Sequence, residues 1–302
     1  MTSKVNRYIF HKIVCAVRDL PRTFRRLPTP RLIMTLLVKN EEELLEKNLL
    51  FHKAMGVDAF IVTDNNSADG TYGIIEKYRR KGWVVDVIRE TATGYEQKEW
   101  VDRMIWRAKM SFGADWVINA DADEFWYAPS GSLKKELSKS RANVLTCEVR
   151  SMYPEEPFWQ WSKAVRPVTD LEAYDLSLYS LFERQNRKVI HRTNGYLQIS
   201  MGNHKVRMLP QYAKSSAIRV YHYNVRGRRQ FMDKMVNGGV QLEEHKGRHG
   251  GRHWRYFYRL YKEGLLEEEY DRVIGKPHFE ELCKCGYIYA DETIRDVFNS
   301  IN

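Results

Sequence analysis

The sequence has few cysteines and no long uncharged apolar run. Four cysteines among 302 residues are too few for a disulfide-stabilised scaffold, and the closely spaced Cys283 and Cys285 have no second pair to complete a zinc site. We therefore expect reduced thiols and a cytoplasmic compartment. No run of about 18 apolar residues predicts a membrane-spanning helix, and residues 1–30 lack the apolar core of a signal peptide.

Two glycine-rich motifs that hold nucleotides are also missing. The sequence contains neither the dinucleotide fingerprint G-x-G-x-x-G nor a phosphate loop that ends in GK[ST]. Because these loops hold the phosphates of dinucleotides and of ATP, their absence disfavours an oxidoreductase and a P-loop ATPase.

Positive charge is abundant and unevenly spread. The formal net charge is +10, and residues 1–31 carry eight basic side chains against one acidic. The apolar residues of this segment can share one face of a short helix, which Pro21 and the prolines after it then end: Ile9, Phe10, Ile13, Val14 and Val17. A basic amphipathic start can lie on an anionic membrane surface, or it can pack on the domain.

A second basic region covers residues 204–262, with fourteen basic against three acidic side chains. Such a region could bind nucleic acid or a small ligand that carries phosphate, and composition alone does not choose between them. The remaining middle of the chain is close to neutral, and residues 263–302 are acidic.

Apolar runs alternate with helical spacing over the first 120 residues. The runs predict strands, and the spacing between them predicts helices at 41–55, about 74–82 and 96–112. The predicted strands are 32–38, 59–63, 84–88 and 116–120. This alternation predicts an α/β fold with a parallel sheet that is covered by helices and joined by right-handed crossovers.

The pattern changes after residue 130. The spacing predicts a helix at 132–139, strands at 143–150, 187–192, 196–200 and 217–223, and helices at 227–237 and 252–262. Residues 151–175 should be irregular, 238–251 a glycine-rich basic link, and 265–302 mostly helical.

Three polar loops follow predicted strands and should open at one edge of the sheet: 39–41, 64–69 and 121–124. Sheets of this kind bind ligands at the carboxyl ends of their strands. Asp121 and Asp123 come directly after a buried strand and can converge on one hard cation, Mg²⁺ or Mn²⁺, which takes further ligands from a substrate diphosphate. The alternative interpretation is an ordinary polar turn.

Five segments resemble the motifs of glycosyltransferases with the GT-A fold, specifically a family-two-like bacterial group. They are LLVKNE (36–41), TDNNSADGT (63–71), NADADEFW (119–126), GNHKV (202–206) and HYNVRGRRQFMDKMVNGG (222–239). The resemblance covers about residues 31–262. It implies a GT-A-like, Rossmann-like, mostly parallel sheet flanked by helices, with a C-terminal helical extension. We accordingly expect a basic arm (1–30), a catalytic domain for nucleotide-sugar and metal (31–225) and an extension (226–302).

The resemblance also implies roles for individual residues at the sheet edge. Asp64 would recognise the nucleotide base, and Lys39 and Glu41 would line the nucleotide pocket. Asp121 would face the ribose and the metal, and Asp123 would bind the metal, Mn²⁺ or Mg²⁺, directly.

His222 would complete this metal site, since neutral imidazole readily joins carboxylates around such cations. Its alternative is a histidine that is hydrogen-bonded beside Tyr221 and Tyr223.

Further residues could contact the donor. Arg226 and Lys234 follow His222 and could stabilise the negative charge that develops on a departing diphosphate. Gln97 and Arg103 could face the cleft, although Arg103 could equally be a surface ion-pair residue.

An inverting transferase needs a general base near the acceptor hydroxyl. The acidic pair that is usual in the family-two motif is not recognisable here, so the candidates are His204, Glu156 and Asp170.

These observations predict a metal-dependent glycosyltransferase that moves a sugar from a nucleotide-diphosphate donor to a glycan, lipid-linked or other hydroxyl acceptor. The resemblance implies inversion and a place in surface polysaccharide synthesis. The protein would be cytoplasmic, peripheral at the inner face of the cell membrane through its basic N-terminus, without a nucleic-acid partner.

Two rivals remain open from the sequence. A sugar nucleotidyltransferase should carry a glycine-rich loop after the first strand, and LLVKNEEE has no glycine there. A basic nucleic-acid-binding protein would show steeply salt-dependent binding.

Overall fold

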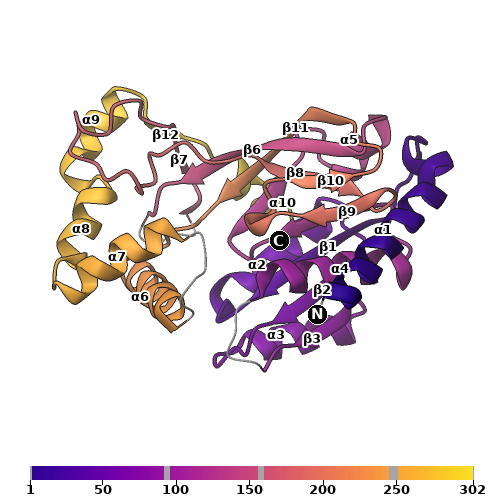
Figure 1. The fold of residues 1–302 in the computed structure, drawn as a ribbon. Coiled ribbons are helices and arrows are strands. Elements are labelled where there is room, and N and C mark those ends of the chain that lie inside the picture. Colours follow the sequence, from indigo (N-terminus) through magenta and orange to yellow (C-terminus); the bar gives the residue numbers. More distant parts are fainter. Residues whose placement is uncertain (1, 92–95, 156–159, 245–250, 302) are drawn as a thin grey trace. The chain divides into compact units, whose positions relative to one another are not determined.

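The computed structural model describes residues 2–91, 96–155, 160–244 and 251–301 (Figure 1). The chain divides into two compact units. The first contains Met1–Val149 and Asn186–Val220, and the second contains Arg150–Gln185 and Tyr221–Asn302.

The first unit begins its sheet with the alternating strands and helices that the apolar pattern predicts. Strands β1, β2, β3 and β4 lie parallel in the order β3-β2-β1-β4, and Ile33 of β1 pairs with Ala59 on one side and Val117 on the other. The elements are β1 (Leu32–Val38), α2 (Glu42–Ala54), β2 (Ala59–Asp64), α3 (Thr71–Arg80), β3 (Val84–Arg89), α4 (Gln97–Met110) and β4 (Trp116–Ala120). The predicted parallel sheet is confirmed.

The other side of this sheet is antiparallel. Strand β8 pairs antiparallel with β4 and with β6, so the strand order in the first unit is β3-β2-β1-β4-β8-β6, and β9 and β10 form a separate antiparallel pair. The elements are β5 (Glu124–Tyr127), α5 (Leu133–Lys139), β6 (Val144–Met152), β8 (Lys188–Arg192), β9 (Tyr196–Ile199), η2 (Met201–Asn203), β10 (Val206–Met208) and β11 (Ala213–His222). Strands β6 and β11 each cross a boundary between the units.

One part of the core of the first unit lies between the sheet and α4. Helix α4 contacts β1 and β2, and its apolar side chains pack against Ile33, Ile61 and Val117. Burying these side chains removes apolar surface from water, which is the main favourable contribution to folding. The packing fixes the parallel strands and therefore the positions of their carboxyl ends.

The N-terminal helix α1 (Thr2–Thr23) contacts β9. Buried Lys12 joins α1 to β9, because its Nζ donates to the carbonyl of Leu197 at 2.9 Å. The same Nζ lies 2.5 Å from Oδ1 of Asp102 in α4. Pro21 lies inside the last turn of α1 and does not end the helix where we expected. A proline at this point removes only one late hydrogen bond, and the helix ends two residues further on.

The second unit is mainly helical, as predicted for its C-terminal part. Its short strand β7 pairs antiparallel with the end of β6 and with β12. Its elements are β7 (Lys163–Val165), α6 (Arg228–Glu244), α7 (Arg252–Lys262), α8 (Leu266–Val273), η3 (Lys276–His278), α9 (Phe279–Lys284), β12 (Ile288–Ala290) and α10 (Thr293–Ile301). Phe231, Phe257 and Tyr270 pack together in its core.

Helix α6 is longer than the sequence pattern predicts. The expectation of a link over 238–251 is wrong for residues 238–244, which continue the helix through Gly238 and Gly239. A Cβ atom on Gly238 would lie 2.5 Å from the ring of Trp254, and one on Gly239 would collide with Tyr258, so both glycines allow α7 to approach closely. Helix packing explains these glycines here, where we had expected a flexible segment.

The fold class is therefore confirmed. The chain has a GT-A-like α/β architecture, with a mixed sheet whose central strands are parallel and flanked by helices, and with helices in its C-terminal part.

Candidate active site

The loops that follow β1 and β2 are joined by hydrogen bonds. The backbone N–H of Asn40 donates to Ser67 Oγ at 3.0 Å, and the N–H of Ala68 donates to Asn40 Oδ1 at 2.8 Å. Asn40 adopts a left-handed conformation with φ of 54°, which asparagine tolerates better than most residues. These bonds fix the loop that carries Lys39, which is exposed, and Glu41, which is partly buried.

A second set of bonds continues this connection. The N–H of Glu42 donates to Asp69 Oδ2 at 3.1 Å, and the N–H of Gly70 donates to Glu42 Oε2 at 2.9 Å. Burial opposes the charge on Asp69, but hydrogen bonds from Thr71 and Glu42 outweigh it and lower the pKa of this carboxyl group. Asp69 therefore stays ionised and keeps the two loops together.

Asp64 is fully buried at the end of β2. Its Oδ1 accepts a hydrogen bond from the N–H of Ser67 at 3.1 Å, and Arg89 Nε lies 3.9 Å from its Oδ2. The guanidinium of Arg89 stacks over the ring of Tyr72 at 4.2 Å. No motif marks Arg89 in the sequence, because only the parallel register of β2 and β3 places it directly beside Asp64.

The Asp121–Asp123 segment follows β4, and the exposure of its acidic side chains decreases along the chain. The Asp121 side chain is 38% exposed, whereas Asp123 and Glu124 are buried. Because Leu36 of β1 pairs with both Val62 and Ala120, the carboxyl ends of β2 and β4 lie on either side of β1. The strand register therefore places these loops at the same edge of the sheet, as predicted.

Helix α2 supports this segment through Asn48, whose Nδ2 donates to the carbonyls of Ala122 at 2.9 Å and Glu124 at 3.0 Å. His52 Nε2 accepts from the N–H of Trp126 at 3.0 Å, so its Nδ1 carries the hydrogen that it donates to the carbonyl of Asn48. Burial lowers the pKa of His52 to about 3, which keeps the ring neutral at physiological pH.

Lys188 of β8 is a buried cation next to these acids. Its Nζ lies 2.5 Å from Glu124 Oε1 and 3.6 Å from Asp121 Oδ2, and its side chain is 5% exposed. Burial opposes its charge, but the attraction of Glu124, Asp121 and Asp123 is larger in sum and raises the pKa of Lys188 above its ordinary value. No motif marks Lys188 in the sequence, because only the antiparallel placement of β8 next to β4 brings it to the acids.

A buried polar chain crosses three neighbouring strands below this edge. Thr35 Oγ1 donates to Asn119 Oδ1 at 2.7 Å, and Asn119 Nδ2 donates to His191 Nε2 at 3.2 Å. His191 Nδ1 donates to the carbonyl of Arg192, and burial lowers the pKa of His191 to about 4. These satisfied bonds hold β1, β4 and β8 in register.

The remaining predicted residues of the first unit lie on different elements. Gln97 is the first residue of α4 and is partly buried. Arg103 forms an ion pair with Glu90, in line with its alternative interpretation. His204 follows η2, and its Nδ1 donates to the carbonyl of Arg187 at 3.1 Å.

His222, Arg226 and Lys234 belong to the second unit. His222 ends β11, the N–H of Arg226 donates to Gln230 Oε1 at 3.0 Å, and Lys234 Nζ donates to the carbonyl of Asn224 at 3.1 Å. The structure thus gathers Arg226 and Lys234 at the connection between β11 and α6. A role for these three residues beside Asp121 and Asp123 stays a prediction.

Two candidates for the general base also lie in this unit. Glu156 is outside the described residues. Asp170 is exposed, and its Oδ1 accepts from the N–H of Ala173 at 3.2 Å.

The sequence matches the model of a known enzyme family. The model of glycosyltransferase family 92 matches residues 40–257, which is more than half of the chain. The chain belongs to glycosyltransferase family 92. It is therefore a glycosyltransferase, as predicted, which selects glycosyl transfer over the nucleotidyltransferase and nucleic-acid-binding alternatives.

Solved structures resemble this family 92 chain only distantly. A mannosyltransferase from Pyrobaculum calidifontis in complex with GDP-Man and Mn²⁺ has 13% sequence identity and a TM-score of 0.42, over 94% of this chain and 85% of its own. Glucosyl-3-phosphoglycerate synthase from Mycobacterium tuberculosis, in complex with Mn²⁺, UDP and glucosyl-3-phosphoglycerate, has 19% identity and a TM-score of 0.28, over 40% and 44%. At these levels neither likeness identifies a ligand of this chain. No curated protein matches the sequence.

The donor atoms at the Asp121–Asp123 segment of this family 92 enzyme suit a hard divalent cation. Both residues offer carboxylate oxygens, which Mg²⁺ and Mn²⁺ prefer, and Asp121 is accessible. In the described parts of the chain, no three histidine, cysteine or acidic side chains are gathered as a ready-made site.

Among the described helices, none has both the length and the apolar composition that a bilayer crossing requires.

Proposed function

We propose that this glycosyltransferase uses a nucleotide-diphosphate sugar as donor, a divalent cation as cofactor and a hydroxyl of a glycan or lipid-linked molecule as acceptor. The observation that carries this proposal is that the Asp64 loop and the Asp121–Asp123 segment lie at the carboxyl ends of β2 and β4, the two parallel strands that flank β1. Ligands of open α/β sheets bind at this edge.

The nucleoside would bind between the loops after β1 and β2. Asp64 offers a buried carboxylate at the strand end, and hydrogen bonds hold the neighbouring backbone of Asn40 and Ser67 in place. Loops that are already held in place lose little conformational entropy when they bind a ligand. Lys39 and Glu41 lie on the same fixed loop and would line the pocket.

Asp121 and Asp123 would hold the cation, Mn²⁺ or Mg²⁺. When bound, it would neutralise the negative charge that develops on the departing diphosphate. The chain's own contribution is to keep both carboxylates in place, through Asn48 beneath the loop and through Lys188 beside Glu124. In this proposal His222, Arg226, Lys234, Gln97 and Arg103 add contacts to the metal or the donor.

The stereochemical outcome and the biological role are part of the same proposal. Inversion requires a base to accept the acceptor's hydroxyl proton, and His204 and Glu156 are the proposed candidates. The family-two-like motifs support a role in surface polysaccharide synthesis at the inner face of the cell membrane.

A donor screen tests the proposal. Purified protein is mixed with Mn²⁺ and each of a panel of nucleotide sugars, and the release of nucleoside diphosphate is measured. The wild-type chain should turn over at least one donor. Asp123→Asn should lower that rate about a hundredfold or more, because loss of a metal ligand removes several kcal/mol of charge stabilisation.

Asp86→Asn is the matched control, since Asp86 lies on β3 in an exposed ion pair with Arg107 and is away from the strand ends. It should keep the wild-type rate. Circular dichroism should show both variants folded. Wild-type activity in Asp123→Asn would refute the proposed metal role.

A further inference from the structure

Helix α1 is attached to the first unit by polar and small side chains. Its inward face carries Lys12, Cys15, Ala16, Asp19 and Thr23, all buried. Lys12 pairs with Asp102, and Asp19 pairs with Lys109 of α4. Among the described side chains of the helix, the buried attachment to the first unit is therefore made mainly by polar and small residues.

Those apolar side chains lie on the opposite face and are exposed. Their positions follow helical spacing over nearly four turns, and their exposed fractions run from 39% to 67%. The residues are Phe10, Ile13, Val14, Val17, Leu20 and Phe24, and we name them the α1 apolar face. An exposed contiguous apolar stripe of this kind indicates an interaction surface.

Basic side chains border the α1 apolar face. Arg18 and Arg22 lie on the helix, and Arg25 and Arg26 follow its end; all four are exposed. The edge-to-face contact of Phe24 with Tyr212, at 6.5 Å between ring centres, connects the end of the face to a pocket in the same unit.

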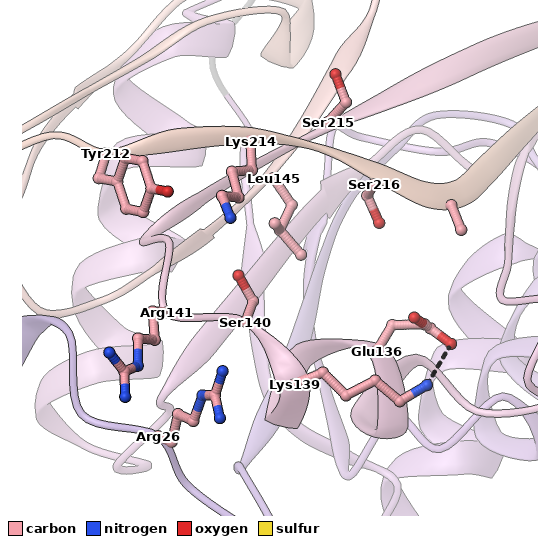
Figure 2. A pocket seen from close by; sticks show the side chains of 11 residues that line it. Arg26, Glu136, Lys139, Ser140, Arg141, Leu145, Tyr212, Lys214, Ser215 and Ser216 are labelled. Atoms are coloured by element: carbon pink, nitrogen blue, oxygen red, sulfur yellow. Dashed lines mark hydrogen bonds and ion pairs between the residues drawn. The ribbon is translucent and has the colours of Figure 1, made fainter.

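This pocket has a volume of about 490 Å³ and is lined mainly by basic and hydroxyl-bearing residues (Figure 2). Arg26, Lys139, Arg141 and Lys214 contribute positive charge, and Glu136 is the one acid in the lining. Figure 2 shows the charged ends of Arg26 and Lys214 directed towards the space between them, while Glu136 is engaged by Lys139 at 3.4 Å. The lining suits an anion that carries phosphate oxygens.

We propose that the α1 apolar face and this pocket together form a docking site for a membrane surface that contains anionic phospholipid. The apolar face would insert among the lipid chains in the interfacial plane, and the pocket would hold a phosphate-bearing headgroup. Charge complementarity selects this occupant, because arginines and lysines surround the apolar stripe and its adjoining pocket. A purely apolar protein partner would leave these charges unused.

The two parts of the site make separable contributions. Apolar insertion depends on the side chains of α1 and is sensitive to any charge placed among them. Headgroup attraction depends on net positive charge, and each basic side chain near an anionic surface contributes about fivefold to binding. Neither contribution depends on which sugar the enzyme transfers.

Vesicle co-sedimentation of the full chain tests the proposal. We expect binding to vesicles of phosphatidylglycerol mixed with phosphatidylcholine, and at least about tenfold weaker binding to phosphatidylcholine alone. Val17→Glu, on the exposed apolar face, should weaken binding to the anionic vesicles about tenfold or more. Arg141→Glu, in the pocket, should also weaken it about tenfold or more, since it removes one positive charge and adds a negative one.

Matched controls place equivalent charge changes elsewhere. Leu178→Glu replaces another exposed apolar side chain, 69% exposed in the second unit, and Arg80→Glu reverses an exposed charge at the end of α3. Both should bind vesicles within about twofold of wild type. Equal binding by wild type, Val17→Glu and Arg141→Glu would overturn the proposal, as would equal binding to neutral vesicles.

A soluble anion separates a headgroup site from a simple phosphate site. Glycerol phosphate should compete with the anionic vesicles in the wild-type chain and lose this effect in Arg141→Glu. Stabilisation of the protein by glycerol phosphate without any vesicle binding would overturn the membrane proposal.

Discussion

At the scale of single residues, the acids near the end of β4 depend on one buried cation. Glu124 is fully buried, and Lys188 is its ion-pair partner at 2.5 Å. A buried pair contributes little net stability, but removal of one partner leaves an uncompensated charge in a low-dielectric interior. Lys188 thereby compensates charge beside Glu124 and keeps the neighbouring Asp121–Asp123 segment in its place.

Lys188→Met should lower the free energy of unfolding by about 3–5 kcal/mol, because it breaks a buried ion pair by removing only one of its two partners. The double variant Lys188→Met/Glu124→Gln should recover much of this loss. Urea denaturation at pH 7 measures both. Lys77→Met is the control, since Lys77 forms an exposed pair with Glu46 and should cost less than about 1 kcal/mol. A Lys188→Met variant as stable as Lys77→Met would contradict this account.

Two buried neutral histidines should make the protein sensitive to mild acid. Burial lowers the pKa of His52 to about 3 and that of His191 to about 4, whereas both rings in the unfolded chain protonate near pH 6.5. Between these values the unfolded chain binds protons that the folded chain does not, so stability falls as the pH drops below about 6.5. Each ring contributes a slope of up to about 1.4 kcal/mol per pH unit.

Urea denaturation between pH 7 and pH 5 measures this slope. His191→Gln keeps an amide that can accept from Asn119 and donate to the carbonyl of Arg192, but it cannot titrate. Its slope should be clearly shallower than that of the wild type, even if its stability at pH 7 is lower. An unchanged slope would show that His191 is not the titrating group.

At the scale of elements, the packing of α6 on α7 depends on two glycines. In a helix interior glycine normally costs about 1 kcal/mol relative to alanine. Gly238 reverses this preference, because an added Cβ would lie 2.5 Å from the ring of Trp254.

Gly238→Ala should therefore destabilise the protein by about 1–3 kcal/mol through overpacking. Gly73→Ala is the matched control, since Gly73 lies in α3 and an added Cβ there meets no atom within 4 Å. It should stabilise by about 0.5–1 kcal/mol. Thermal denaturation of both variants measures the difference, and a stabilising Gly238→Ala would contradict the close packing of the two helices.

Elements with strong periodicity were predictable from the sequence. The apolar run 116–120 matches β4, and the helical spacing at 252–262 matches α7, because each buries a continuous or amphipathic face. The continuation of α6 through Gly238 and Gly239 was not predictable, since glycine locally favours a break and only α7 supplies the contacts that explain it. The short strand β12 was not predictable either, because it pairs with β7, which is distant in the sequence.

At the scale of the whole molecule, some residues of the candidate site were predictable from the local sequence, and others are placed there only by strands that are distant in the sequence. The placement of Asp64 and Asp121 at the same edge of the sheet followed from parallel topology alone. The positions of Arg89 and Lys188 were not predictable in this way. The register of β2 and β3 places Arg89 beside Asp64, and the antiparallel pairing of β8 with β4 places Lys188 near the acids. Local sequence thus indicated the acids, and tertiary structure supplied the cations beside them.

The family assignment covers most of the candidate site. The matched residues 40–257 include the loops after β2 and β4, all but Lys39 of the loop after β1, and the segment from His222 to Lys234. The activity class is therefore established for the chain. The donor, the cation and the roles of individual residues are what the structure leads us to propose.

Binding of Mn²⁺ in the presence of a nucleoside diphosphate tests the central proposal most directly. Electron paramagnetic resonance measures free Mn²⁺ while the wild-type chain, Asp121→Asn, Asp123→Asn and the control Asp86→Asn are titrated. The wild type and Asp86→Asn should each bind a single Mn²⁺ whose affinity rises when the diphosphate is added, and both variants of the Asp121–Asp123 segment should lose this binding. Undiminished Mn²⁺ binding in Asp121→Asn and Asp123→Asn, or none in the wild type, would contradict the account.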